Sequence, residues 1–211
     1  ITATGDIVFD GQNSEGLRSG ATSIVGDSAV GDAGGVTIST NNLTLTNGGR
    51  VSASTLGQGK AGELEIGANA LNLDNNAVIS SQSESTFKAG DITLNIANSL
   101  EAKDSEISTS STQSSGGNLT IAAGDIRLRG DSDLRTDINS GAGGGGNIDV
   151  TADSVIAFDD SDIFAFAADG RGGNITLDTP AFFAENFTLN SLTAENTQLL
   201  ENNNRADVNA T

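Results

Sequence analysis

The chain has 211 residues with 10 Lys and Arg against 28 Asp and Glu, so its formal net charge is −18 at pH 7. This charge argues against binding to nucleic acid or to an anionic membrane surface, because both need clustered Lys and Arg. The chain has no Cys and no His, which excludes disulfides, thiolate metal sites and the commonest general base.

The predicted elements follow one another in a repeat that starts with GDIVF at Gly5. A Gly, one further residue and an alternating apolar pair return at Gly34, Gly62, Gly90, Gly117, Gly146 and Gly173, in steps of 29, 28, 28, 27, 29 and 27 residues. A fixed period of this length predicts a solenoid, in which each unit buries its apolar face by stacking on its neighbours.

Each repeat contains three short stretches with alternating apolar residues. In the coil that begins at Gly62, the first carries Leu64 and Ile66 and the second carries Leu71 and Leu73. The third stretch lies seventeen residues after the glycine and carries Val51, Ile79, Ile107, Leu134 and Ile163 in successive coils. This pattern predicts an all-β fold, a parallel β-helix over residues 1–183 with six to seven coils of 27–29 residues and three short strands per coil.

Two columns of side chains are expected to stack from coil to coil. The glycines Gly34, Gly62, Gly90, Gly117, Gly146 and Gly173 start their coils where a side chain would collide with the coil below. The residues that follow three of them, Asn118, Asn147 and Asn174, are predicted to form a ladder of hydrogen-bonded amides.

The two ends depart from the repeat. Residues 11–34 are predicted to be a long excursion that bulges from the rod, and residues 184–211 are an irregular segment that is either a cap or a linker to a neighbouring subunit. Open solenoid ends expose strand edges, so an uncapped chain is expected to polymerise end to end with copies of itself.

The stretch LTLTNGGRVSASTLGQGKAG at residues 43–62, together with the repeated GGNLTI, GGNIDV and GGNITL phrases, resembles the repeat region of cyanobacterial filamentous-haemagglutinin-like exoproteins of the two-partner secretion family. The resemblance runs from about residue 5 to residue 177. It implies a right-handed parallel β-helix that is exported to the medium or to the outer-membrane cell surface. An outer-membrane transporter partner is implied for the full-length protein only, because the family's secretion domain is not in this sequence, which we expect to be a processed or excised piece.

Asp104, Asp131 and Asp160 each lie fourteen residues after the glycine of their coil. Stacked carboxylates repel one another, and Ca²⁺ would relieve that repulsion, so these residues are candidate calcium ligands. The alternative is a solvated turn, because Asp, Asn and Ser are preferred turn residues in any case. No other cofactor is indicated.

Arg127, Arg129 and Arg135 lie in one coil near Asp131, Asp133 and Asp137. Carboxylates beside Arg occur in β-helices that bind or degrade polysaccharides, and this is the alternative function that the sequence leaves open. Nothing in the spacing is diagnostic, and opposite charges on neighbouring strands are more often surface ion pairs.

Phe164 and Phe166 alternate with Ile163 and Ala165, so an inward Ile163 would turn both rings outward. An exposed pair of rings would form a contact patch for a partner or a glycan, unless the carboxy-terminal segment folds over them as a lid. The sequence as a whole favours a non-catalytic, extracellular structural and adhesive module that contacts surface glycans or other cells.

Overall fold

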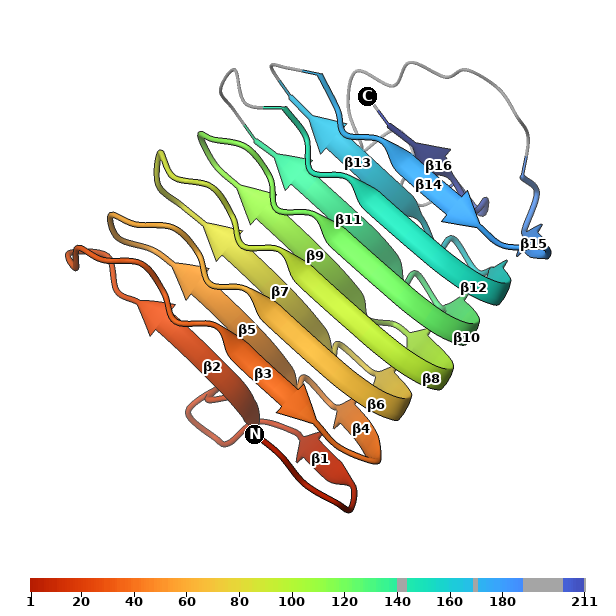
Figure 1. Ribbon diagram of the computed structural model, residues 1–211, viewed down its shortest axis with the longest axis horizontal. Helices are drawn as coiled ribbons and strands as arrows, with labels where there is room; N and C mark the ends of the chain where they lie inside the picture. The colour runs from red at the N-terminus through yellow and green to blue at the C-terminus, as the bar shows by residue number, and fades with distance from the viewer. Residues whose placement is uncertain (140–143, 169–170, 188–202, 211) are drawn as a thin grey trace.

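The computed structural model describes residues 1–139, 144–168, 171–187 and 203–210. In this part of the chain the protein is an all-β parallel solenoid of about six turns, with two parallel sheets and no helix (Figure 1). This confirms the solenoid expected from the repeat. No helix among these residues is long and apolar enough to cross a membrane.

Sheet one has nine strands. They are β1 (Ile7–Asp10), β3 (Val36–Ser39), β4 (Asn42–Thr46), β6 (Leu64–Asp74), β8 (Ile92–Lys103), β10 (Leu119–Arg129), β12 (Ile148–Ala157), β14 (Ile175–Asp178) and β15 (Phe182–Ala184). Along the rod the order is β1-β4-β6-β8-β10-β12-β14, while β3 also pairs with β6 and β15 with β12. Every pair is parallel, as stacking of successive coils requires.

Sheet two has seven strands and lies behind sheet one in Figure 1. They are β2 (Gly20–Val25), β5 (Arg50–Thr55), β7 (Val78–Ser83), β9 (Glu106–Ser111), β11 (Asp133–Ile138), β13 (Ile163–Ala167) and β16 (Val208–Asn209). Consecutive members of this series neighbour one another, so the sheet rises with the coils from β2 to β16. Strands stack at ~4.8 Å, which gives a rod roughly 30 Å long.

Most coils do not contain the three separate strands that the sequence predicts. In four coils the first two predicted strands form one continuous strand of 10–12 residues, namely β6, β8, β10 and β12. The pairing of these long strands is interrupted by shifts in register. The shift between β6 and β8 lies at Ala68 and Ala70, and the shift between β10 and β8 lies at Ala123 and Asp125. The division persists near the ends, where Pro180 lies between β14 and β15 and cannot donate a ladder hydrogen bond.

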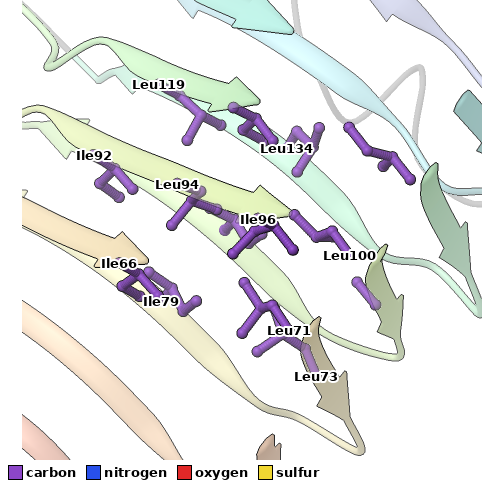
Figure 2. Packing of buried hydrophobic residues seen from close by; sticks show 14 of the residues in the cluster. Ile66, Leu71, Leu73, Ile79, Ile92, Leu94, Ile96, Leu100, Leu119 and Leu134 are labelled. Atoms are coloured by element: carbon purple, nitrogen blue, oxygen red, sulfur yellow. The ribbon is translucent and has the colours of Figure 1, made fainter. Parts of the chain in front are cut away.

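The core lies between the two sheets. Leu64, Ile92, Leu119 and Ile148 stand in register on four neighbouring strands, and each is at most 1% exposed. Figure 2 shows side chains from both sheets, among them Leu94 and Leu134, pointing into the space between them. Burial of this continuous apolar column is the main force that holds the coils together.

The first coil contradicts the expected excursion. Residues 20–25 are strand β2, which pairs with β5 in register from Gly20 and Arg50 to Val25 and Thr55. The strand fits because its inward side chains are small or medium in size, and because a Cβ atom at position 20 would collide with the Arg50 carbonyl. Residues 20–25 therefore supply the first strand of sheet two, while residues 11–19 and 26–34 on either side belong to no strand of the two sheets.

Candidate binding groove on the second sheet

The coil-start glycines form a close-packed column. A Cβ atom at Gly62, Gly90, Gly117, Gly146 or Gly173 would collide with the carbonyl oxygen of the preceding coil's glycine. For Gly34, the first of the six, the nearest atom to such a Cβ is the Ser23 hydroxyl at 3.3 Å. Inward hydroxyls complete the column, because Thr109 Oγ1 donates to the Gly117 carbonyl at 2.7 Å and Thr136 Oγ1 to that of Gly146 at 2.6 Å.

The structure places Asn118, Asn147 and Asn174 one above another. The side-chain oxygen of Asn118 accepts a hydrogen bond from the Asn147 backbone N–H at 3.0 Å, and that of Asn147 accepts from the Asn174 N–H at 2.9 Å. Asp91 continues the column below, since its Oδ1 accepts from the Asn118 N–H at 2.7 Å. The ladder thus runs mainly from side chain to backbone, with one amide-to-amide bond of 3.2 Å between Asn174 and Asn147.

Asp104, Asp131 and Asp160 occupy equivalent turns between the two sheets. All three have positive φ angles, of 49°, 61° and 64°, which Asp and Asn tolerate better than most residues. Burial raises the pKa of Asp131 above its usual value, and the neighbouring charges of Asp160 and Asp104 raise it further. Asp160 Oδ1 accepts hydrogen bonds from the backbone N–H groups of Asn203 and Arg205, both at 3.1 Å.

These contacts favour the turn over the calcium site. The left-handed backbone explains why Asp recurs at this position without any ligand. Among the residues that the structure describes, no group of three or more acidic side chains could hold a metal ion.

The three arginines of the expected charged cluster are not brought together. Arg127 and Arg129 lie on β10 of sheet one, where Arg127 Nη1 pairs with Glu101 at 2.7 Å and Arg129 Nε with Asp159 at 2.6 Å. Arg135 lies on β11 of sheet two. Of these three arginines, Arg135 alone lies on sheet two.

The outer face of sheet two carries a row of serines. Ser52, Ser80 and Ser108 lie side by side on β5, β7 and β9, and Arg135 continues the row on β11. The three serines are only 1%, 7% and 6% exposed, although their neighbours in the chain point into the core. Two of them, Ser80 and Ser108, line a depression on this face.

Two adjoining hollows of about 610 and 410 Å³ lie on this face. Val78, Glu106 and Arg135 line both hollows, so the two form one depression. We call it the sheet-two groove, and its lining includes Arg18, Arg50, Val78, Ser80, Glu106, Ser108, Arg135 and Asp137.

Arg135 is held between two carboxylates in the groove. Its Nε donates to Asp137 Oδ2 at 3.0 Å and its Nη1 to Asp133 Oδ2 at 3.3 Å. The side chains of these three residues are at most 20% exposed. Burial raises the pKa of Asp137, an effect that Arg135 opposes, and burial lowers the pKa of Arg50 with a further contribution from Arg18.

Several polar atoms on this face lack partners. Arg50 Nε, Ser52 Oγ and Asp137 Oδ1 are buried and make no hydrogen bond within the described part of the protein. Buried polar groups in proteins are almost always hydrogen-bonded, to protein or to ordered water. Two of these three residues, Arg50 and Asp137, line the groove, so its lining includes a donor and an acceptor that the described part of the protein leaves unpaired.

Of the two alternatives for Phe164, an exposed ring or a ring covered by the carboxy-terminal segment, the structure supports the covered one. Ile163 and Ala165 do point into the core, but Phe164 is 0% exposed and Phe166 is half-buried. Two neighbours account for this, because Arg135 lies over the Phe164 ring at 5.6 Å and β16 pairs with β13 with Asn209 opposite Phe164. The contact patch expected at both rings is thus reduced to Phe166.

Residues 203–209 lie on the last rung of sheet two. Ala206 is 2% exposed and belongs to the core, and its N–H donates to the Glu185 carbonyl at 3.0 Å. The Asp207 N–H donates to Asp162 Oδ1 at 2.6 Å, and the Asp207 carbonyl accepts from the Ile163 N–H at 2.9 Å. The rest of the segment expected to be a cap or linker from residue 188 to residue 202, and Thr211, lie outside the described residues.

Sequence reasoning singled out Arg135 with Asp133 and Asp137 but missed Arg50 and the serine row. The signal was present, since the groove residues lie sixteen and eighteen positions after each coil-start glycine, on either side of the inward residue at seventeen. Their importance depends on the shape of the sheet, which the repeat does not reveal.

We compared the chain with models of known protein families, with curated proteins and with solved structures, and found no match.

Proposed function

We propose that the chain is a non-catalytic structural and adhesive module, a rigid rod segment of a protein exported to the cell surface or the medium. The observation that carries the proposal is the unbroken parallel pairing of both sheets along the solenoid. Each coil is fixed to its neighbours by backbone ladders, a continuous core and stacked polar side chains. Such an object resists bending and presents its sides as long surfaces.

The resemblance of residues 43–62 to exoproteins of the two-partner secretion family supports export and a right-handed coil. Under this proposal the full-length protein passes an outer-membrane transporter, and the rod meets surface glycans or other cells. The charge of −18 suits a role outside the cell, because it keeps isolated rods apart and soluble.

Copies of the chain are proposed to stack end to end. At the amino-terminal end β1 and β2 each have a single strand neighbour, and the inward Ile7 and Phe9 are only half-buried. At the other end β14 is the last strand of sheet one and β16 the last of sheet two. Stacking would join these edges and continue both sheets from one copy to the next.

Electron microscopy of the purified chain, with light scattering for mass, tests the proposal. Filaments with a regular axial repeat support a self-assembling rod, and monodisperse short rods support a rod that acts without self-assembly. A compact particle without an elongated axis would overturn the structural role. Repeating both measurements with Ca²⁺ and with a chelator tests the candidate sites at Asp104, Asp131 and Asp160.

A carbohydrate-binding or polysaccharide-degrading role is the second candidate. The groove favours it, because Arg135 lies between Asp133 and Asp137 in a depression on the side of the rod. We retain binding without catalysis. Incubation of the chain with acidic and neutral polysaccharides, followed by sizing of the products, checks this, and depolymerisation would show the non-catalytic proposal to be wrong.

A further inference from the structure

We propose that the sheet-two groove binds a neutral oligosaccharide that lies along the axis of the solenoid. This proposal rests on the adhesive role above and deepens it by naming the ligand and its site. It starts from two unpartnered atoms on residues that line the groove, Arg50 Nε and Asp137 Oδ1, because buried polar atoms on a purely structural face are normally paired.

The chemistry of the lining selects a ligand that both donates and accepts hydrogen bonds. Arg50 offers a donor, Asp137 an acceptor, and the Ser80 and Ser108 hydroxyls can serve as either. Sugar hydroxyls match such a mixed set, because each has one donor hydrogen and two acceptor lone pairs. A lipid or an amphipathic helix is disfavoured, since Ala77 and Val78 are the only apolar side chains among the described residues that line the two hollows.

Charge in the groove argues against an anionic ligand. Arg135 is neutralised by Asp133 and Asp137, while Arg50 and Glu106 occupy the same outward column two strands apart. An anionic glycan would also meet the field of a chain with a net charge of −18. A neutral chain of hydroxyls avoids this repulsion and can still form hydrogen bonds with the polar side chains of the lining.

The geometry of the groove fits an extended chain. Its polar positions repeat once per strand, at ~4.8 Å, and three such steps separate Arg50 on β5 from Arg135 on β11, a distance of roughly 14 Å along the rod. On the next strand Phe166 follows Asp137 in the same outward row and is half-buried. Its ring can pack against the C–H face of a sugar at that end of the groove.

Isothermal titration calorimetry tests the proposal with neutral hexasaccharides of β-1,4-glucose, β-1,3-glucose, α-1,4-glucose, β-1,4-xylose and β-1,4-mannose, and with a hexamer of galacturonic acid. We expect at least one neutral hexasaccharide to bind the wild-type chain. Arg50→Gln should weaken this binding about tenfold by removing a charged donor, and Ser108→Trp should abolish it by filling the groove.

Matched controls lie on the outer face of sheet one, where Arg127→Gln and Thr93→Trp make the same changes away from the groove. Both should leave binding within about twofold of wild type, a difference below RT in free energy. Thermal unfolding verifies that each variant is folded. If Ser108→Trp does not fold, the result for Arg50→Gln alone decides the test.

Three outcomes overturn the proposal. These are no binding by any neutral hexasaccharide, tighter binding of the galacturonic acid hexamer, or equal losses in the groove and control variants. A rod seen by microscopy that binds no sugar would refute the groove assignment alone and leave the structural role in place.

Discussion

Asp162 offers a direct test of how the carboxy-terminal rung is attached. Its side chain is 0% exposed, and one oxygen accepts the Asp207 N–H at 2.6 Å while Oδ2 has no partner among the described residues. Burial raises its pKa to about 9, and the charges of Asp133, Asp207 and Asp160 add to this rise, whereas the Asp207 N–H opposes it. Asp162→Asn should keep the accepting oxygen and remove the titration.

The size of the effect follows from proton linkage. In the unfolded chain the carboxyl loses its proton near pH 3.8, whereas in the folded chain it keeps the proton up to about pH 9. Between these values the folded state binds more protons, so raising the pH lowers the free energy of unfolding by about 1.4 kcal/mol per pH unit. At pH 7 this loss of unfolding free energy reaches at most about 4 kcal/mol, and it is absent in Asp162→Asn, whose side chain does not titrate.

Urea unfolding of both proteins between pH 4 and pH 8 measures the difference. We expect the Asn variant to be the more stable at pH 7 and its advantage to shrink towards zero near pH 4. The exposed Asp149, changed to Asn, controls for general charge effects and should leave the pH profile unchanged. An advantage of the same size at every pH would refute the reasoning, because it would show that Asp162 is ionised throughout.

Three further comparisons test the packing. Gly117→Ala should destabilise the fold by about 3 kcal/mol, because its Cβ collides with a carbonyl of the coil below, whereas Gly67→Ala enters open space and should be neutral or slightly stabilising in urea unfolding. Phe164→Ala should cost about 4 kcal/mol in the same assay, while Phe183→Ala, at a ring that is 57% exposed, should change stability by less than about 0.5 kcal/mol. Asn147→Ala removes the acceptor of the Asn174 N–H and should lower the free energy of unfolding by about 1 kcal/mol. A loss near zero would show that the asparagine ladder does not contribute to stability.

The inward half of the structure could be predicted from the sequence. Stacking places equivalent positions of successive coils in register. The 27–29-residue period and the alternation of apolar and polar positions, as at Leu64, Glu65 and Ile66, therefore suffice to assign the core of sheet one. The same reasoning assigned Ile79, Ile107 and Leu134 to the core of sheet two. These assignments succeed because an apolar side chain at an inward position is stabilised by burial in the core and by no other arrangement of the strand.

The outward half could not be predicted in the same way. Alternation correctly turned Phe164 away from the core and left cover by the carboxy-terminal segment open, but it could not tell that Arg135 would also lie over the ring. It also gave no reason to expect Ser52 to be almost completely buried on an outer face. An outward side chain is exposed or covered according to segments that are distant in sequence, and no local pattern encodes them.

The two ends of the solenoid differ in a way that bears on the proposed stacking. Five of the eight large apolar side chains that the described residues leave exposed lie in the first thirty residues: Ile1, Val8, Leu17, Ile24 and Val30. At the opposite end, residues 203–209 are fastened to Asp160 and Asp162 by backbone N–H groups and cover β13. If copies stack, the apolar amino-terminal end supplies the hydrophobic driving force, and β16 is the edge that it has to meet on sheet two. Removing residues 203–211 would then expose β13 in place of β16 as the last strand of sheet two and would leave the apolar amino-terminal end intact. We therefore expect the shortened chain still to stack, with a changed affinity.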